Sequence, residues 1–164
     1  MAKNKEEKTN VMRVLEQKKL AYTPHTYPHE EGVAVDGVTV AESMGFDPAQ
    51  VFKTLVARGA SGQYYVFDVP VAESLDLKKA ARAVGEKSIE MLHQKELLPL
   101  TGYVHGGCSP VGMKKLFPTV FHSSVENLPT VIVSAGKIGY QVELRPADLL
   151  SLVRGRTADI IVEN

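Results

Sequence analysis

The sequence predicts an α/β fold of the α+β type, in which a mixed, largely antiparallel, barrel-like sheet is flanked by helices. Helical and strand patterns alternate along the 164 residues without a fixed repeat. Two runs of β-branched and aromatic residues, 51–59 and 63–71, are separated by the turn-forming stretch ARGASG and predict a central antiparallel hairpin. Because 44% of the residues are hydrophobic, the chain can build one sizeable core. We therefore expect a single domain over residues 1–164.

The first elements are predicted to be a helix and a short strand. Thr9 or Asn10 can cap an amphipathic helix whose apolar side chains recur near the helical period, at Val11, Met12, Leu15 and Leu20. The stretch YTPHTY, residues 22–27, favours a strand because Pro24 and the following Pro28 exclude a helix, whereas its tyrosines and threonines suit a pleated sheet. A short helix that ends at Gly45 is expected within residues 39–50.

The remaining elements follow the hairpin in sequence. Residues 75–85 carry apolar side chains near one helical face and end at Gly85, which is typical of a helix with a glycine C-terminus. The other predicted elements are a short helix within 91–102, strands at 119–123, 130–136 and 140–146, a helix at 146–155 and a last strand at 158–163.

The charge and cysteine content excludes several classes of protein. Nineteen basic and nineteen acidic residues cancel, so no overall field favours DNA or a membrane surface, and an anionic partner must be met by local charge. The single cysteine, Cys108, excludes an internal disulfide and a multi-cysteine metal site. Residues 1–10 lack the apolar core of a signal peptide, and no apolar run reaches the roughly 18 residues of a membrane span. We expect a cytoplasmic protein.

The glycine-rich stretch GGCSPVGMKK, residues 106–115, raises two chemical possibilities. A phosphate-binding P-loop is excluded because Met113 precedes Lys114, no Ser or Thr follows that lysine, and Pro110 removes a backbone donor. Cys108 could act as a nucleophile if a histidine such as His105 or His122 folded beside it. The other interpretation, which free cysteines more often fit, is a small, semi-buried packing residue. The sequence leaves both readings of Cys108 open.

Lys53 is unusual because it interrupts an apolar strand. Its neighbours are Val51, Phe52, Leu55 and Val56, among which an unpaired ammonium group would be costly. One interpretation is a lysine that protects an edge strand from aggregation. The other is a partly buried cation that faces a pocket and holds an anionic or carbonyl-bearing ligand.

A second loop of small residues, VSAGKIGY at 133–140, follows a predicted strand. Such residues allow the polar atoms of a ligand to approach backbone N–H groups, although an ordinary hairpin turn has the same composition. Together with Lys53 and the glycine-rich stretch, this loop favours a ligand cleft. The pair His25 and His29 is not expected to bind metal, because Pro28 argues against the helix that would align them.

Six stretches occur in a fixed order along nearly the whole chain. They are HTYPH (25–29), FKTL (52–55), LKKAARAVG (77–85), TGYVHGGCSPVGMKK (101–115), VSAGKIGYQVEL (133–144) and ADI (158–160). Each stretch alone is weak evidence for any protein family, but the six stretches in this order are specific evidence. It resembles the YbaK family of aminoacyl-tRNA deacylases, which are free-standing relatives of the editing domain inserted in bacterial prolyl-tRNA synthetase.

The resemblance implies the YbaK and prolyl-tRNA synthetase-associated domain fold, with a cleft that receives the 3′ end of a mischarged tRNA. The implied activity is trans-editing of tRNA(Pro) that carries cysteine, because a pocket separates side chains of similar volume by only a few kcal/mol. The implied mechanism is substrate-assisted: the cysteinyl thiol attacks its own ester carbonyl, while the protein supplies position and backbone donors. No metal or other cofactor is implied, and Cys108 is then incidental.

The resemblance also assigns roles to individual residues. Lys53 corresponds to a cleft lysine that holds the terminal adenosine or the aminoacyl ester, and Gly106 with Gly107 corresponds to the loop that orients the aminoacyl end; these three are the expected catalytic residues. The expected substrate-binding residues are Tyr27, Thr54, Ser109, Ser134, Ala135 and Gly136.

Alternatives remain for the substrate and for the activity. Sister branches of the fold remove alanine or other small residues from tRNA(Pro) with water, and a non-catalytic module that binds aminoacyl-tRNA or a nucleotide also remains open. Local cations form no long basic stripe; they are Lys78, Lys79, Arg82, Lys114, Lys115 and Lys137. We therefore expect weak intrinsic tRNA affinity and a transient complex with prolyl-tRNA synthetase.

Overall fold

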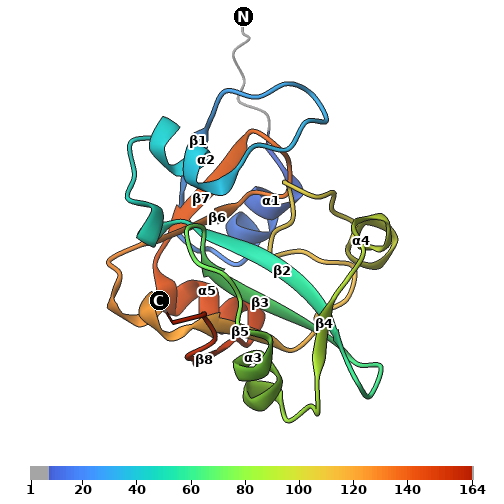
Figure 1. The fold of residues 1–164 in the computed structure, drawn as a ribbon. Helices are drawn as coiled ribbons and strands as arrows, with labels where there is room; N and C mark the ends of the chain where they lie inside the picture. The colour runs from blue at the N-terminus through green and yellow to red at the C-terminus, as the bar shows by residue number, and fades with distance from the viewer. Residues whose placement is uncertain (1–7, 164) are drawn as a thin grey trace, which may run out of the picture.

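The protein is built from two β-sheets and surrounding helices (Figure 1). A computed structural model describes residues 8–163. Its strands are β1 (Thr23–Thr26), β2 (Phe52–Gly59), β3 (Tyr64–Pro70), β4 (Ile89–Met91), β5 (Thr119–His122), β6 (Val131–Ser134), β7 (Tyr140–Leu144) and β8 (Arg156–Ala158). Its α-helices are α1 (Asn10–Gln17), α2 (Gly37–Ser43), α3 (Leu77–Val84), α4 (Gln94–Thr101) and α5 (Pro146–Val153).

The larger sheet has the order β4-β2-β3-β5-β8, and the smaller sheet has the order β1-β7-β6. All pairs are antiparallel except β3 with β5 and β5 with β8. The two sheets meet through a bridge between Val51 and Ile132, just before β2 begins. The prediction of a mixed, largely antiparallel α/β fold is confirmed, but the sheets do not close into a barrel.

The β2–β3 hairpin forms the centre of the larger sheet, as the sequence predicts. Its register pairs Lys53 with Val69 and Thr54 with Asp68. Successive side chains of a strand point to opposite faces. Phe52 and Val56 accordingly belong to one core cluster and Ala57 to another, so Thr54 and Lys53 face opposite sides of the sheet.

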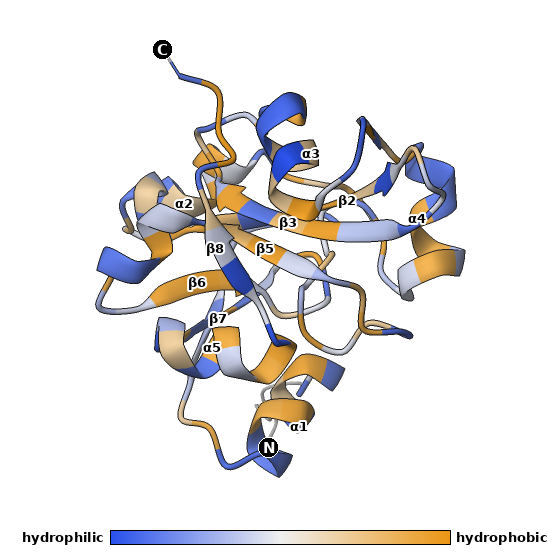
Figure 2. Cartoon of the chain, turned by 90° about the horizontal axis from the view of Figure 1, so that it is seen from below, coloured by the Kyte–Doolittle hydropathy of each residue, from blue (hydrophilic) through white to orange (hydrophobic). Residues whose placement is uncertain are grey.

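The main core lies between the two sheets, α1 and α5. Hydrophobic colours run along β5 and β6 in Figure 2, and the core residues Phe121 and Val133 come from these strands. α1 contributes Val11, Met12 and Leu15, which are all buried, and Thr9 caps it by accepting a hydrogen bond from the Met12 N–H. The helical period therefore identified the correct buried face of α1.

Two short strands differ from the predictions. β4 was not predicted, because three residues are too few to show an alternating pattern. The last strand, β8, is Arg156–Ala158, whereas the prediction placed it at 158–163. Ile160 is fully buried and Ile161 makes only an isolated bridge with Leu75. Ile160 and Ile161 therefore pack against the core without extending the sheet, whereas Val162 is exposed.

Within residues 8–163, no helix has both the length and the apolar composition that a bilayer crossing needs.

Phe121 tests the packing between the central strands and the main core. It is fully buried on β5, and its ring centroid lies 6.5 Å from that of Phe52. Phe121→Ala should lower the free energy of unfolding in urea by about 3–5 kcal/mol, because it opens a cavity that the sheet cannot fill. Leu116→Ala, at a position that is 51% exposed, should change it by less than about 0.5 kcal/mol. Similar small losses for both variants would contradict this packing.

Candidate active site

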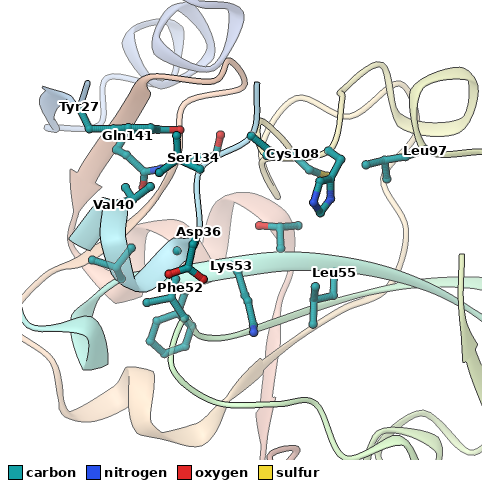
Figure 3. Close-up of a pocket in the computed structure, with 18 residues that line it drawn as sticks. Tyr27, Asp36, Val40, Phe52, Lys53, Leu55, Leu97, Cys108, Ser134 and Gln141 are labelled. Atoms are coloured by element: carbon teal, nitrogen blue, oxygen red, sulfur yellow. The ribbon is translucent and has the colours of Figure 1, made fainter. Parts of the chain in front are cut away.

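A cavity of about 380 Å³ lies between the start of β2, the segment before α2, the glycine-rich loop and the ends of β6 and β7 (Figure 3). Its wall is formed by Tyr27, Ala34, Val35, Asp36, Gly37, Val40, Val51, Phe52, Lys53, Thr54, Leu55, Val71, Leu97, His105, Gly106, Cys108, Ser134 and Gln141. The wall is apolar over much of its area, with polar groups gathered at a few points. This is the usual composition of a site for a small organic group.

Tyr27, Ser134 and Gln141 form a polar corner at one end of the cavity (Figure 3). Ser134 on β6 and Gln141 on β7 are directly paired across the smaller sheet. The Gln141 Oε1 atom is buried and has no hydrogen-bond partner within residues 8–163. Because an unsatisfied buried acceptor is costly, this corner is suited to a donor group of a ligand.

The glycine-rich loop is pressed against two other segments. Gly106 has a φ of +91°, and a Cβ atom there would lie 2.7 Å from the Cβ of Ala34. At Gly107 a Cβ would lie 3.0 Å from the backbone nitrogen of Ile138. A larger residue at either position would therefore displace the loop or the segment packed against it. The Gly107 N–H donates to the Val104 carbonyl, whereas those of Gly106 and Cys108 donate to no group within residues 8–163.

Lys53 lies on the wall, but it points away from the glycine-rich loop. In Figure 3 the side chains of Lys53 and Leu55 leave β2 on the same side, and Cys108 lies on the opposite side. The Lys53 side chain is half-buried, and this burial lowers its pKa, while the negative charges of Asp36 and Glu73 act in the opposite direction. Lys53 thus offers a cation beside the Asp36 end of the cavity.

A buried carboxyl group stands behind the opposite part of the wall. The Thr54 hydroxyl donates a 2.6 Å hydrogen bond to Oδ1 of Asp68, on the neighbouring strand. Asp68 is completely buried, and its Oδ2 has no partner within residues 8–163. Burial raises the pKa of Asp68 to about 8, and the Thr54 hydrogen bond offsets only part of this effect.

Cys108 lacks the surroundings of a nucleophile. Only 8% of the residue is exposed, and burial, followed by the nearby Asp68 charge, raises the pKa of its thiol to about 12. His105 also lines the cavity but forms no hydrogen bond with Cys108 in the part of the chain that the structure describes. His122 is engaged elsewhere, since its Nδ1 accepts from the Ile160 N–H. The packing interpretation of Cys108 is favoured, because a neutral thiol is a poor nucleophile.

The structure brings together five of the nine expected site residues. Those on the cavity wall are Lys53, Gly106, Tyr27, Thr54 and Ser134. The other four are not part of the wall. Gly107 lies close to the backbone of Ile138, and the Ser109 hydroxyl is fully buried and accepts from the Val111 N–H. The Ala135 N–H donates to the Tyr140 carbonyl, and the Gly136 N–H donates to the Ser134 hydroxyl.

Three residues of interest were missed from the sequence. Asp36 and Gln141 are part of the cavity wall, and Asp68 lies directly behind it. Asp68 carried a signal that could have been read, because it interrupts an apolar strand in the same way as Lys53 does. Asp36 caps α2 by accepting from the Thr39 N–H, a role that accounts for this residue type without any ligand. Within residues 8–163, no three His, Cys, Asp or Glu side chains converge as a metal site.

Replacing Asp68 should change how stability depends on pH. Its folded pKa of about 8 lies above the ordinary value of 3.8, so the folded state holds a proton that the unfolded chain releases between these values. The contribution of Asp68 to wild-type stability therefore falls as pH rises from about 4 to about 8. Because asparagine does not titrate, the stability of Asp68→Asn relative to wild type should increase by about 1 kcal/mol per pH unit between pH 5 and 8.

Urea unfolding at pH 5, 6.5 and 8 measures this effect. Asp47→Asn is the matched control, because Asp47 is exposed and asparagine also caps helical turns. Its stability relative to wild type should show no comparable increase with pH. Parallel pH profiles for wild type and Asp68→Asn would contradict the description of Asp68 as a buried, proton-holding carboxyl.

Comparisons with known proteins agree on one family. The family model of the aminoacyl-tRNA editing domain matches residues 32–152. The chain is 46% identical over 161 residues to EbsC of Enterococcus faecalis, a candidate Cys-tRNA(Pro)/Cys-tRNA(Cys) deacylase, and the match covers 98% of both chains. It is also 27% identical over 100 residues to a proline–tRNA ligase of Shouchella clausii, covering 61% of this chain and 17% of the ligase.

The fold is similar to that of a solved relative. A crystal structure of a candidate trans-editing enzyme for prolyl-tRNA synthetase superposes with a TM-score of 0.80 at 28% identity, covering 93% of this chain and 95% of the other. The family match spans the hairpin, the glycine-rich loop and two residues of the polar corner, Ser134 and Gln141, whereas Tyr27 precedes it. The chain belongs to the aminoacyl-tRNA editing domain family, of the YbaK type.

Proposed function

We propose that this protein is a trans-acting deacylase that removes cysteine from mischarged tRNA(Pro). The observation that carries the proposal is the 46% identity to EbsC over 98% of both chains. The cavity supports it, because its volume of about 380 Å³ suits an aminoacyl group with part of the terminal adenosine. An aminoacyl-tRNA substrate would also put the activity in the cytoplasm, where translation takes place.

The proposed reaction uses the thiol of the substrate. The cysteinyl sulfur attacks its own ester carbonyl, so that a C–S bond forms and the ester C–O bond breaks. The ribose oxygen leaves with the proton that the thiol gives up, and the amino acid leaves as a cysteine thiolactone. Cys108 does not supply an activated nucleophile to the cavity, since burial keeps its thiol neutral. The N–H groups of Gly106 and Cys108 are available to stabilise the negative charge that develops on the carbonyl oxygen.

The remaining wall residues receive binding roles in this proposal. The polar corner of Tyr27, Ser134 and Gln141 would receive the α-amino group, for which the unpartnered Gln141 oxygen is a suitable acceptor. Lys53 points away from the glycine-rich loop, so it would hold the terminal adenosine or its phosphate at the Asp36 end of the cavity.

Selection of tRNA(Pro) is assigned to a partner. The net charge of zero gives the protein no general attraction for nucleic acid. We therefore propose that a transient complex with prolyl-tRNA synthetase supplies the tRNA identity that the cavity does not read.

A deacylation assay tests the proposal. Purified protein is incubated with Cys-tRNA(Pro), Ala-tRNA(Pro) and Pro-tRNA(Pro), with and without prolyl-tRNA synthetase, and loss of each ester is followed. Wild type and Cys108→Ala should both remove cysteine. Lys53→Ala should be slower by about tenfold or more, because it loses a charge-assisted contact. Lys87→Ala is the matched control, because this lysine is exposed and is not part of the cavity wall.

Other outcomes distinguish the alternatives. Preference for the alanyl ester would assign the protein to a sister branch that uses water. Saturable tRNA binding without cleavage of any ester would indicate a binding module. Loss of activity in Cys108→Ala, with rapid alkylation of that thiol, would contradict the substrate-assisted mechanism.

A further inference from the structure

Asp68 is a buried carboxyl group that the proposed reaction does not use. It sits on β3, in the centre of the larger sheet, and is fully buried. One oxygen is 2.6 Å from the Thr54 hydroxyl, and the other has no partner within residues 8–163. Because Thr54 is part of the cavity wall, Asp68 is separated from the substrate space by a single side chain.

The surroundings of Asp68 are nearly free of other ionisable groups. Across β2 it faces Thr54, and across β5 it is paired with the apolar Phe121. From the glycine-rich loop it is approached by Cys108, whose thiol has a pKa raised to about 12 and stays neutral. Lys53 and His122 respond to other acids, namely Asp36 with Glu73 and Asp159 with Glu73. The carboxyl therefore interacts mainly with Thr54.

The Asp68–Thr54 contact has two possible hydrogen arrangements. When Asp68 is ionised it can only accept, so the Thr54 hydrogen points to Asp68 and an oxygen lone pair faces the cavity. When Asp68 is protonated it can donate to the Thr54 oxygen, which releases the Thr54 hydrogen toward the cavity. An oxygen–oxygen distance of 2.6 Å suits both arrangements. The two states present opposite hydrogen-bonding character to a ligand.

We propose that Asp68 is a positioning residue that sets, through Thr54, whether the cavity offers a hydrogen-bond donor or an acceptor at this point of its wall. This inference rests on the proposed function, because it assumes that the aminoacyl end of a tRNA occupies the cavity. In the protonated state the Thr54 hydroxyl donates to a ligand oxygen, such as the carbonyl of the aminoacyl group. In the ionised state it cannot, so binding weakens as pH rises through the titration of Asp68.

Binding of an unreactive analogue tests this proposal. The probe is 3′-deoxy-3′-(S-methyl-L-cysteinylamino)adenosine, which keeps the carbonyl but has no scissile ester and no titrating thiol. Its affinity is measured by calorimetry between pH 6.5 and 9.5 for wild type, Asp68→Asn, Thr54→Val and Thr54→Ser. Titration of the ligand amino group is common to all four proteins and cancels in the comparison.

Wild type should lose about three- to tenfold more affinity over this range than Asp68→Asn, which can donate to Thr54 at every pH. Thr54→Val should bind weakly throughout with the shallow pH dependence of Asp68→Asn, and Thr54→Ser should restore the wild-type profile. Equal profiles for wild type and Asp68→Asn would overturn the proposal, as would a wild-type profile in Thr54→Val.

A second measurement needs no ligand and separates this inference from the proposed function. The carboxyl carbon of Asp68 is followed by ¹³C NMR in the free protein, with Asp68→Asn providing the assignment. Removing the Thr54 hydroxyl should raise the pKa of Asp68, since that hydroxyl stabilises the ionised form. An unchanged titration of Asp68 in Thr54→Val would overturn the proposed coupling of Asp68 with Thr54, even if the protein cleaves Cys-tRNA(Pro). A shifted titration of Asp68 would support this coupling even if the protein does not cleave Cys-tRNA(Pro).

Discussion

The antiparallel pairing of β2 with β3 is the constraint on which the rest of the molecule depends. It places β4 and β5 on either side of the hairpin, and through β5 it also places β8. The same register brings Thr54 beside Asp68 and turns Lys53 to the opposite face of the sheet. One structural element thus supports the core and also places a hydroxyl, a cation and a buried acid around the cavity.

The loops around the cavity depend on close backbone packing. Gly106 and Gly107 allow the glycine-rich loop to touch Ala34 and Ile138, which no larger residue could do without displacement. In the same loop, the Gly106 and Cys108 N–H groups have no hydrogen-bond partner in the described part of the chain. An editing reaction that relies on a nucleophile within the substrate needs such fixed donors more than it needs a reactive side chain. The buried, neutral thiol of Cys108 is consistent with a reaction in which the substrate supplies the nucleophile and the protein supplies the donors.

The sequence predicts the fold well wherever a pattern is long enough to read. The hairpin, α1 and α3 follow from alternating strands, helical periodicity and a terminal glycine, whereas β4 is too short to show a period. The site is predictable in part. The sequence identifies Lys53 as a charge in an apolar strand. Which face of the sheet its side chain points to becomes clear only from the structure. The pairing of Ser134 with Gln141 depends on register, which residue types alone do not reveal.

We propose that the cavity beside the glycine-rich loop holds the aminoacylated end of a tRNA. A crystal structure with 3′-deoxy-3′-(L-cysteinylamino)adenosine would show whether it does. We expect the aminoacyl carbonyl within hydrogen-bond distance of the Gly106 or Cys108 N–H, and the amino group in the corner formed by Tyr27, Ser134 and Gln141. An analogue bound outside this cavity, or with its amino acid turned away from the glycine-rich loop, would rule out this role of the cavity.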